Sequence, residues 1–251
     1  MPLSVVIITK NESHIIGNTL QSLEGVTDNI VIVDSGSTDD TVFICKQFGA
    51  SVIETGWDGY GPNKNKGIAA ANHNWILNLD ADEAIDEELK AFLLMQDLGD
   101  DNIVYEAHFK NFFCGKHIRY GEWSGDKHIR FFNRTKIKWN DAAVHESLIL
   151  SAGTRIRQLK GNILHYTSNS IDDHISKAIA YAKLNAEKYF RQNKRAGFFK
   201  LRMAPGWTFF QHYIFRLGFL DGWEGYFIAK TTAWYTFLKY SYLREMNRKG
   251  V

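Results

Sequence analysis

The stretch Trp75-Ile76-Leu77-Asn78-Leu79-Asp80-Ala81-Asp82-Glu83 decides the fold, because an apolar, strand-like run ends in acidic side chains. Open α/β sheets bind their ligands at the carboxyl ends of their strands, so this run predicts a ligand site as well as a strand. Asp80 and Asp82 are expected to have different roles: one carboxylate holds a divalent cation, and the other reaches a neighbouring hydroxyl. Taken alone, Asp-x-Asp more often marks a polar turn after a buried strand, so the surrounding sequence must decide.

Strands and helices alternate in the residues that precede this stretch. Residues 3–9 form a β-branched run typical of a fully buried strand, and an amphipathic stretch to Leu23 follows. Residues 29–34 form a second apolar run of this kind and predict another strand. Strands that alternate with helices at this spacing predict an α/β fold with a mostly parallel sheet and right-handed crossovers. Thr9, Asn11, Asp34 and Asp80 are then expected at one sheet edge.

The remaining elements of this region have local signals. Ser37-x-x-Asp40 resembles a capping box and predicts a helix that runs to Phe48, and residues 51–54 predict a short strand. Pro62 suits the first turn of a helix that continues through Ala71. The strand that ends at Asp80 would then be the fourth of the parallel sheet.

Three motifs, in this order and at these separations, resemble the family 2 glycosyltransferases, which have a GT-A (Rossmann-like) fold. They are Val-Ile-Ile-Thr-Lys-Asn-Glu at 6–12, Val-Asp-Ser-Gly-Ser-Thr-Asp at 33–39 and Leu-Asp-Ala-Asp-Glu at 79–83. Elements at 61–65, 119–121, 126–132 and 144–146 are similar to the subgroup that contains the lipopolysaccharide-core β-1,4-glucosyltransferases.

The resemblance implies an inverting enzyme that moves a hexose, most plausibly glucose, from a UDP-sugar to a lipopolysaccharide inner-core or other glycolipid acceptor. Two alternatives stay open: the same fold acting on a soluble or protein acceptor, and a non-catalytic scaffold that binds nucleotide sugars. The likeness covers residues 1–170 and extends more loosely to the end of the chain.

The resemblance also implies how the donor is held. The base and ribose would lie against the ends of the first two strands, where a carboxylate such as Asp34 can accept from a uracil N3–H. An ammonium such as Lys64 is a point-charge partner for the diphosphate. The expected nucleotide-binding residues are Thr9, Asn11, Glu12, Asp34, Lys64, Asp80 and Ala81.

Departure of a nucleoside diphosphate requires a cation to neutralise the charge that builds on the leaving phosphates. Mg²⁺ or Mn²⁺ on Asp82 would supply it, and the resemblance places Asp80 near the ribose and a metal-bound water.

Inversion requires a general base that takes the proton of the acceptor hydroxyl. The match to the Val-His-Glu element favours Glu146, with His145 and Asp141 as other candidates, and His145 could instead bind metal or diphosphate. An ordinary surface acid is the alternative for Glu146. Asp126 is expected to support the acceptor and Arg130 to fix the loop or contact phosphate, although a structural ion pair explains both equally well. A partnered histidine at a strand end is the preferred interpretation of His165.

Composition is consistent with a cytoplasmic enzyme. The chain has 251 residues and 45% hydrophobic content, enough for one substantial α/β core and an additional helical region. Cys45 and Cys114 are too few for a disulfide scaffold and lack metal-ligand spacing. The amino terminus lacks the basic segment and cleavage site of a secretory signal, so the predicted location is the cytoplasm.

The region at 171–251 is predicted to be helical and separate from a catalytic domain at 1–170. Residues 170–191 have helical periodicity, and bulky groups recur every three or four residues from Phe219 to Leu238. Residues 194–251 carry ten Lys or Arg against three acidic residues and are rich in aromatic side chains. No apolar run there approaches the roughly 20 residues that span a bilayer. Three partners stay open: the catalytic domain, another subunit in a homo-oligomer, and the inner face of the cytoplasmic membrane. Nucleic acid is not expected.

Overall fold

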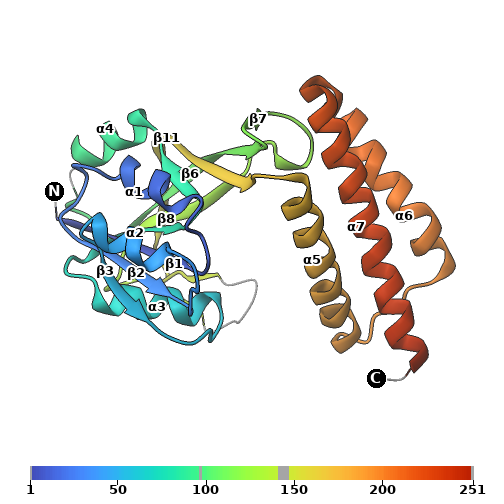
Figure 1. Cartoon of the computed structure of the whole chain (residues 1–251), viewed down its shortest axis with the longest axis horizontal. Helices are drawn as coiled ribbons and strands as arrows, with labels where there is room; N and C mark the ends of the chain where they lie inside the picture. The colour runs from blue at the N-terminus through green and yellow to red at the C-terminus, as the bar shows by residue number, and fades with distance from the viewer. Residues whose placement is uncertain (1, 96–97, 141–146, 250–251) are drawn as a thin grey trace. The chain divides into compact units, whose positions relative to one another are not determined.

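The computed structural model describes residues 2–95, 98–140 and 147–249, and Figure 1 shows their elements. The chain forms two compact units. The first, which we call the sheet unit, takes residues 1–110 and 126–165, and the second, the helical unit, takes residues 111–125 and 166–251. The predicted division at residue 170 did not place residues 111–125 with the helices.

Four parallel strands form the amino-terminal half of the sheet. They are β1 (Leu3–Thr9), β2 (Ile30–Asp34), β3 (Ser51–Glu54) and β4 (Trp75–Asp80), and β1 lies between β2 and β4. Each of these strands was predicted. The almost uninterrupted apolar runs of β1, β2 and β4 suit strands that are covered on both faces, whereas β3 is short and partly exposed. The predicted α/β class, with a parallel core and a helical, aromatic-rich carboxyl-terminal region, is confirmed.

Antiparallel strands extend the sheet beyond β4, in the order β8 (Lys127–Asn133), β6 (Ile103–Phe113), β11 (Arg155–Ser168) and β5 (Glu83–Ile85). β4 pairs with β8 through Trp75 and Asn133, and β11 pairs with β5 through His165 and Glu83. A separate small sheet joins β9 (Lys138–Trp139) to β10 (Leu148–Ile149). The antiparallel strands bring later parts of the sequence beside the end of β4.

Helices cover both faces of the parallel strands. Alternate residues of β1 belong to different apolar clusters: Val5 lies in a cluster with residues of α1 (Ile16–Ser22), α2 (Thr41–Gln47) and α4 (Glu87–Met95). Val6 lies in a second cluster with Ile68 of α3 (Tyr60–Ala70). The alternation of side chains along a strand therefore divides the core of the sheet unit into two layers.

The predicted capping box at Ser37 is wrong. Helix α2 begins at Thr41, its N-cap is Asp40, and no side chain caps it there. The Ser37 hydroxyl donates to the carboxylate of Asp34 and accepts from the backbone N–H of Asn11. Ser37 therefore closes a loop at the sheet edge instead of starting a helix.

The helical unit contains α5 (Ile171–Arg191), α6 (Phe198–Phe210) and α7 (Gly222–Lys249), with short η1 (Gly121–Trp123), η2 (Gln211–Phe215) and η3 (Gly218–Asp221) and the small strand β7 (Lys116–Ile118). The predicted helix after Ser170 is confirmed, and the Ser170 hydroxyl caps it by accepting from Asp173 N–H. Both α5 and α6 pack along α7.

Buried Asp221 connects residues 111–125 to these helices. Its carboxylate accepts from the backbone N–H groups of Arg119 and Tyr120, at 3.0 and 2.8 Å. Among the residues that the structure describes, no helix is both long and apolar enough to cross a membrane.

The packing of α3 on the sheet depends on Gly67, and this gives a first test. A Cβ atom at Gly67 would lie 2.5 Å from Val6 Cγ1 and 2.9 Å from Val33 Cγ2, both on fully buried side chains. We expect Gly67→Ala to lower the free energy of unfolding by about 1–3 kcal/mol, because the helix must move away from the strands. Urea titration followed by circular dichroism measures the change.

Gly17→Ala in α1 is the matched control, because a Cβ there meets nothing within 4 Å. Alanine should leave stability unchanged or raise it by up to about 1 kcal/mol, since it is the better helix former. Equal stability of the Gly67→Ala variant and the wild type would contradict the close packing.

Candidate functional site

The carboxyl ends of β1, β2 and β4 bring the predicted residues together. Thr9 of β1 is the register partner of Asp34 in β2, and Ile8 is the partner of Asp80 in β4. Because the three strands are parallel and adjacent, their last residues lie at one edge of the sheet. The structure therefore places Thr9, Asp34 and Asp80 as neighbours, where an open α/β sheet binds ligands.

The loops that follow β1 and β2 are bonded to each other. Asn11 N–H donates to Ser37 Oγ at 2.8 Å, and Asn11 Oδ1 accepts from Thr38 N–H at 2.7 Å. Asn11 has a φ of 55°, a left-handed conformation that asparagine tolerates better than most residues. Glu12 N–H donates to Thr41 Oγ1 at 2.8 Å. These bonds give the predicted base and ribose region a defined backbone.

Buried Asp34 organises the second loop. Its Oδ2 accepts from the N–H groups of Gly36 and Ser37, at 3.0 and 2.9 Å, and its Oδ1 accepts from the Ser37 hydroxyl. A carboxylate has about four acceptor sites, so these bonds leave capacity for a further donor. The predicted contact with a uracil N3–H stays a prediction.

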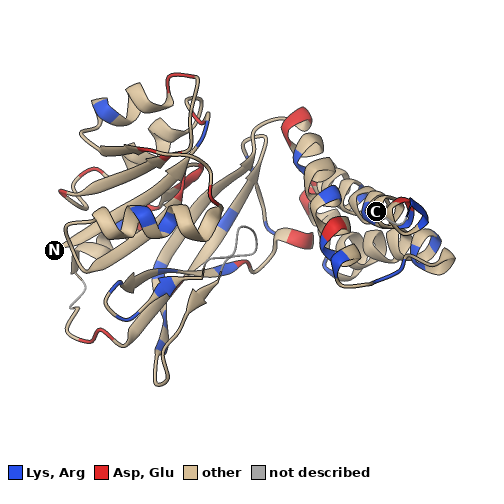
Figure 2. Cartoon of the chain, turned by 90° about the horizontal axis from the view of Figure 1, so that it is seen from below, with Lys and Arg blue, Asp and Glu red and all other residues tan. Residues whose placement is uncertain are grey.

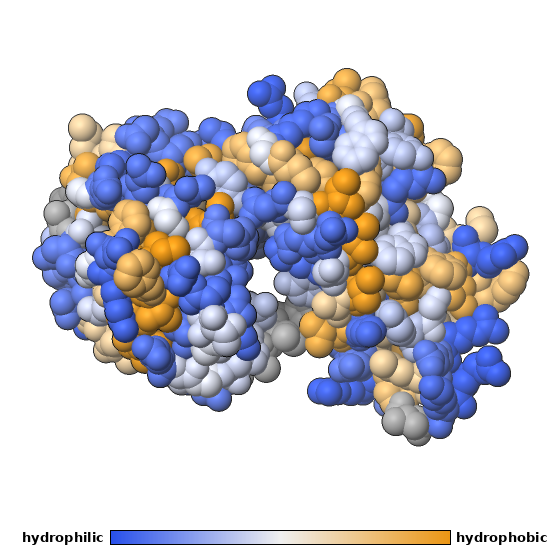
Figure 3. All heavy atoms as spheres, viewed as in Figure 1, coloured by the Kyte–Doolittle hydropathy of each residue, from blue (hydrophilic) through white to orange (hydrophobic). Residues whose placement is uncertain are grey.

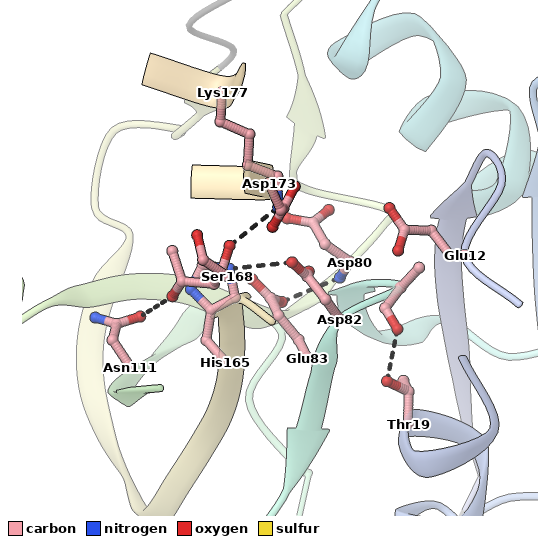
Figure 4. Close-up of polar contacts among 12 residues, drawn as sticks. Glu12, Thr19, Asp80, Asp82, Glu83, Asn111, His165, Ser168, Asp173 and Lys177 are labelled. Atoms are coloured by element: carbon pink, nitrogen blue, oxygen red, sulfur yellow. Dashed lines mark hydrogen bonds and ion pairs between the residues drawn. The ribbon is translucent and has the colours of Figure 1, made fainter. Parts of the chain in front are cut away.

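The turn after β4 carries the acidic residues. Ala81 is buried, and its carbonyl accepts from Thr19 Oγ1 of α1 at 2.7 Å. Asp80 N–H donates to Glu83 Oε2 at 3.0 Å, so the turn is closed by one of its own side chains. Figure 4 shows Asp80, Asp82 and Glu83 projecting from this short segment.

Two cations hold Asp80 from different elements. Lys64 of α3 places Nζ 3.2 Å from Asp80 Oδ1, and Arg130 of β8 places NH2 3.1 Å from Asp80 Oδ2. The Lys64 side chain is 1% exposed and lies over the Trp139 ring, 4.6 Å from its centroid. Arg130 also donates to Glu83 Oε1 at 2.5 Å. We call Lys64, Asp80, Glu83 and Arg130 the buried ion network.

The network shifts the pKa values of its acids in opposite directions. Burial alone would raise the pKa of Asp80, but the charges of Lys64 and Arg130 outweigh it and hold this pKa below the ordinary value. Burial dominates at Glu83 and raises its pKa, although Arg130 opposes the shift. Asp80, which faces two cations, is thus kept ionised, and Glu83 is the easier of the two acids to protonate.

His165 faces the second aspartate of the turn. It lies within β11, not at a strand end as expected, and its Nε2 is 3.5 Å from Asp82 Oδ2 (Figure 4). Burial alone would lower the pKa of His165, yet the hydrogen bond to Asp82 and the charges of Asp82, Glu83 and Asp80 raise it. The imidazole is therefore a direct neighbour of the proposed metal ligand.

The structure describes some of the predicted acceptor-side residues and not others. Glu146, His145 and Asp141 lie outside the described residues. Asp126 precedes β8, and its Oδ1 is 2.9 Å from His128 Nε2. Arg130, for which a phosphate contact was one expectation, directs its guanidinium to the two carboxylates of the buried ion network.

Some buried polar atoms near the site have no hydrogen-bond partner within the part of the chain that the structure describes. Among them are Thr9 Oγ1, Asn63 Oδ1 and Trp139 Nε1. Asn63 lies beside Lys64 on α3, and its Nδ2 donates to Ser35 Oγ at 2.9 Å, next to the end of β2. Buried polar groups normally find a partner, so these atoms are candidates for contacts with a bound ligand.

The donor groups at the turn fit a divalent cation that is held mainly by a substrate. No set of three or more His, Cys, Asp or Glu side chains within residues 2–95, 98–140 and 147–249 is arranged to hold a metal ion alone. Mg²⁺ typically binds one or two carboxylates together with water and substrate phosphates. Asp82, with His165 beside it, provides such a partial set, while Asp80 and Glu83 are already paired with cations.

Sequence reasoning assigned no role to Glu83 and underestimated His165. Glu83 was within the quoted acidic stretch, but its burial at 1% exposure comes from pairing with Arg130. The available signal was its place before Ala84 and Ile85, since an acid that opens a short apolar run is often buried with a partner. No local signal places His165 beside Asp82, because that proximity depends on strand pairing.

Comparison with known proteins adds the family. The sequence profile of Glycosyl transferase family 2 matches residues 4–154. A lipopolysaccharide core biosynthesis glycosyltransferase, LpsC of Rhizobium meliloti, is 30% identical over 95% of this chain and 90% of its own. An uncharacterized glycosyltransferase of Rickettsia typhi is 29% identical over 99% of this chain and 88% of its own. Among solved structures, S. aureus TarS 1–349 in complex with UDP-GlcNAc aligns over 100% of this chain and 92% of its own, with 18% identity and a TM-score of 0.48.

The buried ion network gives a second test. We expect Arg130→Met to lower the free energy of unfolding by about 3–5 kcal/mol, because it leaves two adjacent carboxylates with Lys64 as their remaining cation in the network. Adding Glu83→Gln should recover part of the loss, since one of the buried charges is then removed. Urea titration of the single and double variants measures both effects.

Arg155→Met is the control, because its pair with Asp100 lies at the surface and such pairs contribute about 0–1 kcal/mol. If the loss for Arg130→Met is no larger than the loss for this control, the network does not stabilise the turn.

Proposed function

The chain belongs to glycosyl transferase family 2, and from that premise we propose that it transfers a hexose, with glucose as the first candidate, from a UDP-sugar to a glycolipid acceptor with inversion. The observation that carries the proposal is the acidic turn after β4. It presents Asp82 beside His165, while the adjacent Asp80 is held by Lys64 and Arg130. The LpsC relative, named for lipopolysaccharide core biosynthesis, supports the lipopolysaccharide core as the acceptor class, and within it we propose the inner core.

The donor would lie along the shared edge of β1, β2 and β4. Thr9, Asn11, Glu12 and Asp34 supply hydroxyl, amide and carboxylate groups for uridine, and the bonds between their two loops keep them in place before a ligand arrives. Asp80 ends β4, the next strand, and Lys64 of α3 contacts it, where the ribose and diphosphate would follow. The buried hydroxyl of Thr9 has no hydrogen-bond partner in the described chain, which supports its use in a ligand contact.

Asp82 is the proposed primary ligand for Mg²⁺ or Mn²⁺, with His165 beside it and Asp80 reaching the ion through water. When bound, the cation would act as a Lewis acid that neutralises charge on the departing diphosphate. The buried ion network would fix the direction of the turn that carries Asp82.

The acceptor half of the mechanism rests on the motif at 144–146. An inverting transfer needs one carboxylate or imidazole on the face of the sugar opposite the leaving group, to take the acceptor proton. Glu146 is the proposed base, His145 and Asp141 are the other candidates, and Asp126 is proposed to support the acceptor. Asp126 is paired with His128, so this pair would have to open for Asp126 to reach an acceptor hydroxyl.

Asp82 provides the direct test of the mechanism. Asp82→Ala should reduce turnover about a hundredfold or more, because the loss of about 3 kcal/mol of charge stabilisation in the transition state corresponds to that factor. UDP release with Mn²⁺ measures turnover, and calorimetry with Mn²⁺ and UDP measures binding. Asp101→Asn, a change to an exposed surface acid, is the control that should retain full activity. Undiminished transfer by Asp82→Ala would contradict the mechanism.

The donor class has a separate test. Across UDP-glucose, UDP-galactose, UDP-N-acetylglucosamine and GDP-mannose, we expect UDP-glucose to be turned over fastest. Asp34 suits a uracil N3–H, and the uridine pocket would place a purine poorly. Release of the nucleoside diphosphate, measured for each donor with Mg²⁺ and with Mn²⁺, decides the order. Fastest turnover of GDP-mannose would contradict the assignment of uridine as the donor nucleoside. Fastest turnover of another UDP-sugar would contradict glucose as the donor sugar and leave the uridine assignment standing.

A further inference from the structure

Helix α6 exposes an apolar stripe to solvent. Phe199, Met203, Trp207 and Phe210 recur at intervals of three or four residues, so they share one side of the helix. Their exposed fractions are 79%, 66%, 62% and 56%. A surface helix normally turns such a stripe toward the core. Here the core-facing side is occupied by other residues, among them buried Leu201, where α6 packs on α7.

The exposed apolar surface continues beyond α6 within the helical unit. The face seen in Figure 3 shows apolar residues interspersed with charged ones across this unit. Large exposed apolar surfaces on proteins typically mark an interaction site. Among the further large apolar side chains exposed in this unit are Phe198, Phe215, Leu220 and Trp223.

Positive charge accompanies the apolar surface. Residues 188–220 contain seven Lys or Arg and no Asp or Glu. Two of the basic residues, Lys200 and Arg202, are exposed on α6 itself. Figure 2 shows further Lys and Arg in the helices near the carboxyl terminus. The surface that offers aromatic rings to a partner is therefore strongly cationic.

A groove between α6 and α7 combines the two properties. Its volume is about 760 Å³, and Phe198 and Phe237 line it together with Arg202, Arg244 and Arg248. Among the described residues that line it, Glu245 is the one carboxylate, and it pairs with Lys249 at 2.5 Å. Guanidinium groups are suited to phosphate, and the rings offer an apolar wall beside it. The groove therefore fits an anionic headgroup attached to an apolar chain.

We propose that α6 and the α6–α7 groove dock the protein on an anionic phospholipid bilayer. The exposed rings of α6 enter the interface between headgroups and acyl chains, and the arginines of the groove bind lipid phosphate. A second copy of this chain is a poorer occupant, because pairing two such surfaces would bring their positive charges together. The inference rests on the proposed function and deepens it, because a bilayer is the surface that carries lipid-linked acceptors.

Co-sedimentation of the full chain with vesicles tests the docking surface without any donor or acceptor. Wild type should bind mixed phosphatidylglycerol–phosphatidylcholine vesicles more tightly than pure phosphatidylcholine vesicles, and added salt should weaken binding to the mixed vesicles. Equal affinity for both vesicle types, or no binding to either, would overturn the proposal.

Substitutions separate the apolar and the charged contributions. Phe199→Glu and Trp207→Glu should each weaken binding to mixed vesicles by at least tenfold, whereas Phe43→Glu, which changes an equally exposed ring of α2, should not. Arg244→Glu with Arg248→Glu should weaken it by at least about fivefold for each arginine replaced, because each basic residue near an anionic surface contributes about 1 kcal/mol. Arg157→Glu with Lys160→Glu, on exposed positions of β11, is the charge control.

Measurements of folding and of donor hydrolysis separate a failure of the docking surface from a failure of the proposed function. Thermal unfolding and circular dichroism should be unchanged in the α6 variants, and their donor hydrolysis without vesicles should equal that of wild type. Equal loss in the variants and their controls would overturn the docking surface. So would a stable dimer that Trp207→Glu dissociates while lipid binding persists. Failure of UDP release in the wild type, with vesicle binding retained, would instead count against the proposed function alone.

Discussion

The rest of the site depends on the pairing of two buried cations with two carboxylates, of which Glu83 is buried and Asp80 is partly exposed. Lys64 comes from α3, Arg130 from β8, and Asp80 and Glu83 flank the turn after β4. Unpaired charges are costly in a low-dielectric interior, so each member fixes the position of the others. The network therefore connects the parallel half of the sheet to its antiparallel half, at the point where the acidic turn begins.

This pairing gives the two aspartates of the turn different environments. Asp80 faces two cations, and its pKa is held low, whereas Asp82 faces His165. A cation arriving with a diphosphate would meet less competition from protein charges at Asp82 than at Asp80. Local residue order alone does not distinguish the two carboxylates; the elements that approach each of them do. Lys64 and Arg130 would thus be the structural cause of the proposed difference in role between Asp80 and Asp82.

The sequence was sufficient for the parallel half of the fold because its signals are local. The apolar runs of β1, β2 and β4 are covered on both faces, and parallel neighbours must end at the same edge, so the meeting of Thr9, Asp34 and Asp80 followed from alternation alone. The antiparallel half depends on long-range pairing. The bond between Arg130 and Glu83 spans 47 residues, and β11 has to pair with β5 before His165 can lie beside Asp82. The capping box predicted at Ser37 was wrong because the Ser37 hydroxyl donates to the carboxylate of Asp34 instead of capping a helix.

Helix α6 shows the same limit of local sequence signals in the helical unit. Its residues are apolar almost all round, so no periodicity indicates which side is buried, and the sequence alone predicted no separate helix there. Packing on α7 removes the ambiguity, because it covers Leu201 and leaves Phe199, Met203 and Trp207 in contact with solvent. A helix that is apolar on both sides needs a second apolar environment. Because the uncovered side lies in a segment with seven basic and no acidic residues, an anionic surface satisfies both the apolar and the electrostatic requirement.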